Sequence, residues 1–418
     1  MQVGHEVISQ AGQRGRLPTG WRLADFSEFM KRTERRIALD DATCYRCVGV
    51  RWYGRGAFIR EELFGKSITR KQQWVIRAGD VVYNKLFAWK GAFAVANDTV
   101  DGCIVSDKFP TYTADPSVVD PVFLAFHFRT HQLSRQAEIL SQGAAAVSKL
   151  TLNPPQFWKL RIPIPDIAEQ RRISKRLSEQ VAQAEEIREA AMLQAKAAKA
   201  LPASLLRQVF DSDEAMQWPT VPLGKVCEFL PARSIRSDGN TNVLAVTTAC
   251  LGETGFLPAG LKEARMDSAD ASETALRAGE ILIARSNTPE LVGRVAQYLG
   301  HPSPIVASDL TIRVWPTDPR IRGGFLAAYL SKLYTTGFWR QKAGGTSGTM
   351  KKITRRLLTE QTIPVPSIAE QERLVQQLGE RMAHTHRLRE AAEAQLEAVN
   401  ALPNLLLEEV FGGLEPPT

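Results

Sequence analysis

The sequence predicts an α+β protein: two related mixed α/β domains joined by two long helices that form an antiparallel coiled coil. The main observation is an internal repeat, because Ile162–Phe210 returns as Ile363–Phe411, 201 residues later, with roughly half of its positions identical and no gap. The regions before each copy are basic and rich in strand patterns. A chain of 418 residues also exceeds what one hydrophobic core usually organises. A repeat this long indicates a duplicated domain pair with a pseudo-twofold axis, not a solenoid.

The repeat divides the chain into six segments. We expect an N-terminal extension that is flexible (1–20), a first variable domain (21–161), a first helical spacer (162–212), a second variable domain (218–362), a second helical spacer (363–412) and a C-terminal tail (413–418). The spacers carry the repeated sequence, whereas the variable domains share only scattered landmarks.

Each spacer begins with signals for the start of a helix. The two prolines of Ile-Pro-x-Pro hold an extended backbone that cannot continue a helix from the N-terminal side. Asp166 is then expected to cap the first helix, and Glu169 completes a capping-box pattern. Ser367 and Glu370 occupy the same positions in the second copy.

Apolar and small residues recur through both spacers at alternating steps of three and four, which is the a/d pattern of a coiled coil. The expected interface residues are Leu177, Val181, Ala184, Ala191 and Ala195 in the first copy, and Leu378, Met382, Leu388, Ala392, Leu396 and Val399 in the second. Pro202 and Pro403 are expected to end the helices, so a helix from Ala168 to Ala200 would be about 50 Å long. We predict that the copies pair with each other. The alternative is two core helices, each buried in its own domain.

The variable domains share one pattern of elements. Trp74–Tyr83 and Ala275–Ala284 both contain an Ala-Gly-acid turn followed by a strand expected to be buried. Asp120–Phe128 and Gly324–Leu330 are expected to be helices. The two domains therefore have the same predicted scaffold and different surface residues, which is typical of related domains that recognise different targets.

The positive charge is confined to the variable domains. Residues 1–161 carry a net charge of +8 and residues 218–362 carry +6, whereas the spacers 162–217 and 363–418 carry −1 and −5. Lys and Arg that neutralise phosphates supply most of the affinity for nucleic acids. The charge therefore favours a polyanionic partner, although a mildly basic domain of this size is also common.

Several classes of protein are disfavoured. No apolar run is long enough to cross a membrane, and Met1–Gly20 lacks the apolar core of a secretion signal. The five cysteines are scattered, and Cys44-x-x-Cys47 has no second pair or histidine at metal-binding spacing. We expect a cytoplasmic protein without a membrane partner, a metal site or a cofactor of its own.

At these residues the chain closely resembles the specificity subunit of type I restriction–modification systems. The resemblance covers about Trp21 to Glu415. It rests on the Ile-Pro-x-Pro-x-x-x-Glu-Gln starts of the spacers, on their Leu-Leu-x-x-Val-Phe exits, the second followed by Gly412-Gly413-Leu414, and on the alternation of variable domain and repeated helix.

The resemblance implies that each variable domain is a target recognition domain that reads half of a bipartite site in double-stranded DNA. It also implies that the paired helices set the half-site spacing and dock two modification subunits, to which two restriction (translocase–nuclease) subunits are added. Adenine methylation and cleavage belong to those partners, so S-adenosylmethionine, ATP and magnesium are expected there. This chain would have no catalytic residue.

Candidate DNA contacts follow from residue chemistry, since Arg reads guanine, Asn reads adenine, and Lys, hydroxyls and backbone amides hold phosphates. The candidates in the first domain are Lys31, Arg32, Arg35, Arg36, Arg51, Trp52, Tyr53, Arg55, Asn84 and Lys85. Those in the second domain are Arg233, Arg236, Arg285, Ser286 and Asn287. Asn84-Lys85 and Arg285–Asn287 follow equivalent strands. For the run from Lys31 to Arg36, a solvated helix face is an equally good interpretation.

A further candidate lies before each spacer. Gly344–Lys352 resembles the family's Gly/Ser/Thr loop, and its candidate phosphate contacts are Thr346, Ser347, Thr349, Lys351 and Lys352. The first copy, Gln142–Lys149, has Ala in place of most hydroxyls, so only Ser148 and Lys149 remain as candidates.

Two other functions stay open. A stand-alone methyltransferase or nuclease is one rival, because Asn153-Pro-Pro-Gln-Phe157 resembles the Asn-Pro-Pro-aromatic motif of adenine methyltransferases. Its fourth position is Gln, no Gly-rich cofactor turn precedes it, and Asn153 is better interpreted as a helix cap. A coiled-coil assembly protein without a nucleic-acid role is the other rival.

Overall fold

The computed structural model describes residues 17–141, 150–235, 239–253, 255–345 and 349–414. These residues form two compact units, of which unit 1 takes Met1–Glu189 with Glu397–Thr418 and unit 2 takes Ala190–Leu396. Each unit therefore contains one variable domain, part of the first long helix and part of the second. The mixture of helices and sheets confirms the predicted α+β class.

The described residues of unit 1 form three sheets, with strand orders β1-β11, β2-β10-β7-β8 and β3-β6-β9-β4-β5. The strands are β1 (Arg22–Asp25), β2 (Met30–Thr33), β3 (Arg36–Ala38), β4 (Cys44–Val50), β5 (Ala57–Phe64), β6 (Gln72–Val75), β7 (Val81–Tyr83), β8 (Phe93–Val95), β9 (Ile104–Val105), β10 (Thr111–Ala114) and β11 (Arg161–Ile164). Its short helices are α1 (Phe26–Phe29), α2 (Pro121–Phe128), α3 (His131–Leu140) and α4 (Pro154–Phe157).

Unit 2 repeats most of this plan, with strand orders β12-β21, β13-β19-β16-β18, β14-β15 and β17-β20. The strands are β12 (Thr220–Pro222), β13 (Cys227–Leu230), β14 (Thr241–Ala245), β15 (Lys262–Met266), β16 (Ile281–Ala284), β17 (Ser286–Asn287), β18 (Val295–Gln297), β19 (Thr311–Pro316), β20 (Lys351–Lys352) and β21 (Thr362–Pro364). Its short helices are α6 (Ser268–Thr274), α7 (Gly323–Thr335), α8 (Phe338–Lys342) and α9 (Arg355–Glu360). The central sheets of the two units correspond strand by strand.

The two long helices are α5 (Ile167–Phe210) and α10 (Ile368–Phe411), each of 44 residues. Both have the predicted cap: the backbone N–H of Glu169 donates to the Asp166 carboxylate at 2.9 Å, and that of Glu370 donates to the Ser367 hydroxyl at 3.3 Å. The predicted capping box is not completed, since the carboxylates of Glu169 and Glu370 accept from Arg172 and Arg373 of the same helix. The cap satisfies one of the backbone N–H groups that a helix start leaves without a partner.

The prediction that Pro202 and Pro403 end these helices is wrong, since both prolines lie inside them. A proline removes one backbone hydrogen bond and crowds the preceding turn. The residues after each proline, as far as Phe210 and Phe411, supply buried apolar side chains to a variable domain. We attribute the continued helix to this burial, which offsets the local cost of the proline.

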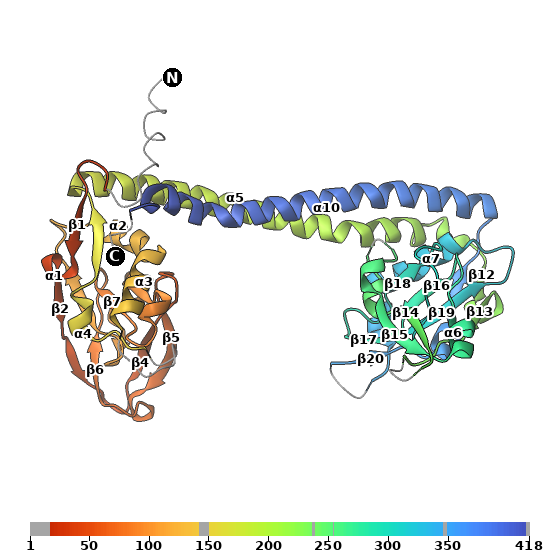
Figure 1. Cartoon of the computed structure of the whole chain (residues 1–418), viewed down its shortest axis with the longest axis horizontal. Helices are drawn as coiled ribbons and strands as arrows, with labels where there is room; N and C mark the ends of the chain where they lie inside the picture. Colours follow the sequence, from red (N-terminus) through yellow and green to blue (C-terminus); the bar gives the residue numbers. More distant parts are fainter. Residues whose placement is uncertain (1–16, 142–149, 236–238, 254, 346–348, 415–418) are drawn as a thin grey trace, which may run out of the picture. The chain divides into compact units, whose positions relative to one another are not determined.

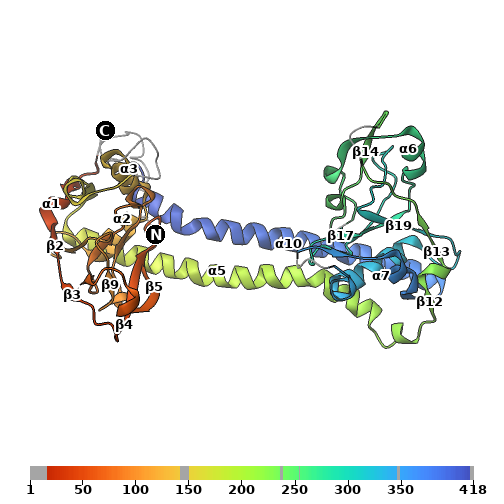
Figure 2. The ribbon, with the colours of Figure 1, turned by 90° about the horizontal axis from the view of Figure 1, so that it is seen from below.

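The C-terminal end of each long helix packs on a shorter helix of a variable domain, α2 in unit 1 and α7 in unit 2. In unit 1, α2 lies against the beginning of α5 and the end of α10 (Figure 1), and the rings of Phe123 and Phe411 lie 5.3 Å apart. In unit 2, α7 lies beside the corresponding segments (Figure 2), and the rings of Phe325 and Phe210 lie 5.4 Å apart. The repeated Val-Phe pair at the end of each long helix therefore packs that helix against a variable domain.

The glutamine of the Glu-Gln pair at each spacer start has a structural role. Gln170 is fully buried, and its amide nitrogen donates to the carbonyl oxygens of Val118 and Pro165 at 2.9 and 3.0 Å. Its amide oxygen accepts from the backbone N–H of Asp120, where α2 begins, at 2.9 Å. Gln371 makes the same three contacts in unit 2. Each glutamine thus fixes the start of a long helix to the start of α2 or α7.

Burial along the long helices follows a seven-residue period. The buried positions are Leu177, Ala184, Ala191 and Ala198 on α5, and Leu378, Thr385, Ala392 and Val399 on α10. Among the other predicted interface residues, Val181, Ala195, Met382 and Leu396 are half-buried, whereas Leu388 is 44% exposed. In unit 2 the guanidinium of Arg381 on α10 also donates to the side-chain oxygen of Gln208 on α5 at 2.7 Å. Pairing along the full coiled coil stays a prediction.

Within the described ranges, no helix combines the length and apolar character needed to cross a membrane.

Candidate nucleic-acid interface

In unit 2 the fold brings two separately predicted segments together as neighbouring strands. β17 pairs with β20, with Ser286 opposite Lys352 and Asn287 opposite Lys351. Lys352 and Gly344 also exchange backbone hydrogen bonds of 3.1 and 2.8 Å. Figure 1 shows β17 and β20 at the end of unit 2 that faces away from α7. Basic, amide and glycine groups therefore form one surface cluster.

The glycine next to this cluster makes a close backbone approach. Gly345 has φ +153°, and a Cβ built on it would lie 2.5 Å from the carbonyl oxygen of Met350. Lys352 is exposed and Lys351 is half-buried, and neither forms an ion pair with any residue that the structure describes. Two unpaired ammonium groups beside exposed backbone suit a phosphate. Thr349 has a polar partner of its own, and the predicted contacts Thr346 and Ser347 lie outside the described residues.

The arginines of unit 2 are more constrained than the lysines. The Arg285 guanidinium donates to the backbone carbonyl oxygen of Asp309 at 3.3 Å, so this side chain is held by the neighbouring segment. Arg233 lies 2.8 Å from the Glu273 carboxylate and 3.5 Å from that of Asp270. Its charge is therefore already compensated at the surface. Arg236 lies outside the described residues.

Unit 1 holds its equivalent strand end with the same backbone contacts. Lys85 donates its backbone N–H to Lys108 and accepts from Leu152, both at 3.0 Å. In unit 2 the backbone N–H of Arg285 donates to Leu310 at 2.9 Å, and its carbonyl oxygen accepts from Ile353, the equivalent of Leu152, at 2.8 Å. Lys85 and Arg285 therefore occupy one structural position in two domains. The predicted phosphate contacts Ser148 and Lys149 are outside the described residues.

A second candidate loop lies beside this strand end in unit 1. The ring of Trp52 is 5.6 Å from that of Phe87, and the backbone N–H of Tyr53 donates to the carbonyl oxygen of Lys90 at 2.9 Å. Trp52 and Tyr53 are 41% and 52% exposed. The segments Arg51–Gly56 and Asn84–Lys90 therefore form one surface, on which aromatic rings lie among basic groups.

Sequence reasoning missed two cations of this surface. The ammonium of Lys90 lies 3.8 Å from the centre of the Trp52 ring. Burial lowers the pKa of the Arg129 guanidinium, and the nearby Arg55 charge adds to the shift. Lys90 could have been found from its aromatic neighbours Phe87 and Trp89, whereas the approach of Arg129 depends on the packing of α2.

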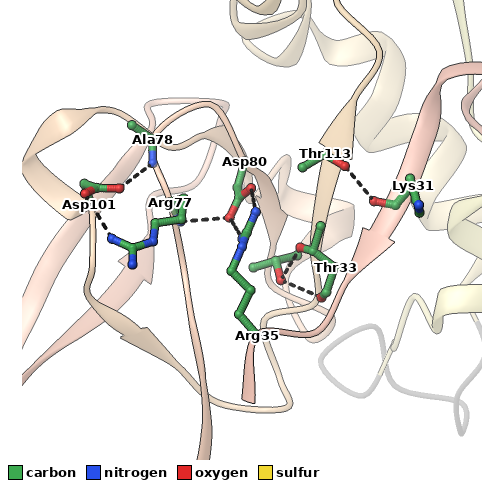
Figure 3. A network of polar contacts seen from close by, with 9 residues as sticks. Lys31, Thr33, Arg35, Arg77, Ala78, Asp80, Asp101 and Thr113 are labelled. Atoms are coloured by element: carbon green, nitrogen blue, oxygen red, sulfur yellow. Dashed lines mark hydrogen bonds and ion pairs between the residues drawn. The ribbon is translucent and has the colours of Figure 1, made fainter. Parts of the chain in front are cut away.

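The basic run from Lys31 to Arg36 lies on β2, at the start of β3 and in the short segment between them, so the alternative of a solvated helix face does not apply. Arg35 makes a two-pronged contact with the buried carboxylate of Asp80, at 2.5 and 3.1 Å (Figure 3). That carboxylate also accepts from the backbone N–H of Arg77 at 2.8 Å. Arg35 thus holds the Ala-Gly-Asp turn that precedes β7, and we remove it from the proposed DNA contacts.

The neighbours of Arg35 are also paired in part. Glu34 accepts from Arg36 at 2.7 Å and lies 2.9 Å from Arg32. The hydrogen bond from Arg36 lowers the pKa of the Glu34 carboxyl. These contacts are exposed and weak, so water or phosphate can replace them. Lys31 is exposed, and within the described part of the chain its ammonium has no carboxylate partner.

Unit 2 holds the equivalent turn with a fully buried ion pair. Glu280 occupies the position of Asp80 and accepts from the backbone N–H of Arg277 at 2.9 Å. Arg313, on β19, donates twice to Glu280 at 2.8 Å, and its other N–H groups reach backbone carbonyl oxygens, among them that of Pro231 at 2.7 Å. The same function is thus performed by arginines from different places in the fold: Arg35 lies between β2 and β3, and Arg313 lies on β19.

The features that suggested catalysis have structural explanations. Asn153 precedes α4 as expected, with Pro154 at its first position, although its side chain makes no capping hydrogen bond. Burial raises the pKa of the thiols of Cys47 and Cys103, which keeps them protonated. Among the described residues, no group of His, Cys, Asp and Glu is arranged to hold a metal ion.

Comparisons with known proteins identify the fold. No family model matches the chain. The specificity subunit of the type I restriction enzyme StySPI from Salmonella potsdam is 22% identical over 309 residues, which are 71% of this chain and 65% of that protein. The match thus spans less than two thirds of the curated relative.

Solved structures match over more of the length. A chain from a study of complex assembly and conformational transition of the type I R-M system has a TM-score of 0.72 and 22% identity, covering 95% of this chain and 98% of that chain. The HsdS subunit from Thermoanaerobacter tengcongensis has a TM-score of 0.62 and 21% identity, with the same coverage. The chain therefore has the fold of type I restriction–modification specificity subunits, which confirms the resemblance predicted from its repeat and spacer motifs.

Proposed function

We propose that this chain is the DNA sequence-recognition subunit of a type I restriction–modification complex. Each variable domain acts as a target recognition domain for one half of a bipartite DNA site. The observation that carries the proposal is the equivalent strand end in both units, where Asn84-Lys85 and Arg285–Asn287 stand on one backbone framework. One framework with two different sets of base-reading and phosphate-binding groups suits two different half-sites.

The division of labour in such a complex leaves no chemistry to this chain. The curated relative is called a specificity subunit. Methylation and cleavage are assigned to two modification subunits and two restriction subunits, with S-adenosylmethionine, ATP and magnesium bound by those partners. The long helices would set the half-site spacing and dock the modification subunits, and the complex would work in the cytoplasm.

The decisive experiment is to produce this chain with its modification subunits and sequence the methylated adenines of the host DNA. The expected result is one bipartite motif with a fixed spacer. The rival enzyme is tested with the purified chain, S-adenosylmethionine and DNA. Methyl transfer without any added subunit would refute a non-catalytic role. Absence of any motif in the complete complex would instead favour an assembly protein that does not read DNA.

A further inference from the structure

The β4–β5 hairpin of unit 1 ends in a loop, Arg51–Gly56, with an unusual backbone. Tyr53 has φ +60° and is the sole non-glycine residue with a positive φ among those described. A left-handed conformation is uncommon for a residue with a bulky side chain, and such strain persists when the surrounding structure enforces it. The ring of Tyr53 is nevertheless 52% exposed, so its own burial does not explain the strain.

The surroundings hold the loop on three sides. The backbone N–H of Gly54 donates to the carbonyl oxygen of Gly91 at 2.8 Å, next to the bond from Tyr53 to Lys90. A Cβ on Gly54 would lie 2.2 Å from the carbonyl oxygen of Phe128, so the close approach requires glycine. Arg51 closes the loop by donating its backbone N–H to Gly56 at 3.0 Å. These contacts fix the backbone of the loop in the conformation that leaves the Tyr53 ring exposed to solvent.

The two aromatic residues of the loop have different surroundings. Lys90 and Phe87 both contact Trp52, and the Trp52 ring stands edge-on to Tyr53, with centroids 6.5 Å apart. Trp52 therefore supports its neighbour, whereas Tyr53 has the larger free surface.

Three cations belong to this loop or to the segment that holds it: Arg51 lies over the ring of Phe58, Lys90 lies over the ring of Trp52, and Arg55 follows Gly54 in the loop. Arg51, Arg55 and Lys90 form no ion pair with any carboxylate in the described part of the chain. An exposed aromatic ring among cations is the arrangement with which proteins bind the bases and phosphates of nucleic acids. An apolar protein partner would not need three unpaired positive charges.

The corresponding segment of unit 2, Leu251–Phe256, differs from this loop in its described residues. At the positions of Trp52 and Tyr53, 200 residues later, stand Gly252 and Glu253. The Glu253 carboxylate forms an ion pair with Arg389 of α10 and lies 3.9 Å from Arg294. Glu253 thus makes the segment acidic and attaches it to a long helix, and its described ring, Phe256, is half-buried and packs 5.2 Å from the ring of Tyr298.

The geometry points to Tyr53 as a base-stacking residue: its ring stacks on a nucleobase at the half-site read by the first recognition domain, and the second domain has no such contact. The inference rests on the proposed function and names the mode of recognition at one half-site. Stacking against a base that is partly unstacked from its neighbours would add sequence discrimination without hydrogen bonds to base edges.

The test uses the complex with modification subunits and a duplex carrying the target found by methylome sequencing. Tyr53→Gly removes the ring and suits a positive φ, so it preserves the loop. It should weaken binding of the target by roughly 5- to 150-fold, whereas Tyr53→Phe should bind like the original chain. With 2-aminopurine in the first half-site, fluorescence should change on binding at one position, because the probe exchanges stacking on its neighbours for stacking on the Tyr53 ring. This change should disappear in Tyr53→Gly alone.

Phe64→Ala is the matched control, because Phe64 is an exposed ring beside Lys66 at the other end of the same hairpin. It should leave affinity and fluorescence unchanged. Target binding by Tyr53→Gly at the original strength would overturn the inference, as would loss of the modification subunits from that variant, which would mark a protein contact. If the unaltered complex does not prefer the target over a scrambled duplex, the proposed function itself fails.

Discussion

The two variable domains share a backbone framework and differ in the side chains that complete it. In unit 1 the Ala-Gly-Asp turn before β7 is held by Arg35, which is partly exposed. The tip of the β4–β5 hairpin carries two exposed aromatic rings. In unit 2 the same turn is held by the buried Arg313, and the tip is bound to α10 through Glu253. A duplicated scaffold thus keeps its backbone contacts, while the side chains that complete them come from different segments of each domain.

The largest effect is expected from exchanging a whole domain. Replacing residues 218–362 by the equivalent domain of another specificity subunit should change one half-site completely and leave the other half-site and the spacer intact. Methylome sequencing of a host with the hybrid measures this. A change in both half-sites would show that the two domains do not read DNA independently.

The next comparison concerns the two arginines that hold the turns. Arg313→Met leaves the carboxylate of Glu280, which is 0% exposed, without its partner, and should cost about 3–5 kcal/mol of stability in unit 2. Arg35→Met also leaves a buried carboxylate, that of Asp80, but should cost less, about 2 kcal/mol, because Arg35 is 37% exposed and water can enter the space that it leaves. Urea unfolding measures both losses, and equal losses would contradict the role of burial.

The helix seam can be tested with two leucines of the same helix. Leu378→Glu places a charge at a position that is 5% exposed and should destabilise unit 2 by about 3 kcal/mol or more. Leu388→Glu is the control, because that side chain is 44% exposed and the change should be within about 0.5 kcal/mol. Thermal unfolding and binding of the modification subunits give the answer. Similar behaviour of both variants would argue against the seven-residue seam.

Acid should destabilise unit 1 through His127, which lies 5.3 Å from the Phe411 ring. Burial lowers the pKa of His127 from 6.5 to about 3, so the unfolded chain binds a proton that the folded chain rejects. Its contribution to stability is complete above pH 6.5 and is lost as the pH falls toward 3, with about 2 kcal/mol lost between pH 7 and 5.

The control for this pH effect is His127→Phe, which should flatten the pH dependence of unfolding of unit 1. In unit 2 the equivalent position is Tyr329, whose pKa is raised by burial, so no change of charge is expected there at acid pH. An unaltered pH profile in His127→Phe would assign the acid sensitivity to other groups.

The smallest effect concerns phosphate contacts. Lys351→Ala with Lys352→Ala should lower the slope of log affinity against log salt by about 1.8, and Lys85→Ala by about 0.9, equally on all sequences. Binding measured between low and physiological salt, on target and on unrelated duplexes, tests this. A loss confined to one base pair would mean that these lysines read sequence.

Much of the fold could be predicted because its signals are local. Asp166 and Ser367 cap helices as their spacing indicated, and the Ala-Gly-acid turns precede buried strands. The ends of the helices could not be predicted from the prolines, since whether a helix continues past Pro202 depends on a domain distant in sequence that buries Phe210.

The candidate site was only partly predictable. The residues after β7 and β16 were found from their equivalent positions, but nothing in the sequence showed that Asn287 would pair with Lys351. Nor could sequence distinguish Arg35, committed to Asp80, from Lys31, because both have the same local composition around them. Partners of side chains far apart in the chain are set by packing.

By itself, the sequence determined the twofold plan, the starts of both long helices and the separation of basic domains from acidic spacers, since these follow from repetition, capping and charge. Tertiary structure alone decided which cations stay free for a phosphate and which hold a turn, and which aromatic ring remains exposed. The physical reason is that a charge or a ring is available to DNA when folding leaves it without a partner, and partners come from anywhere in the chain.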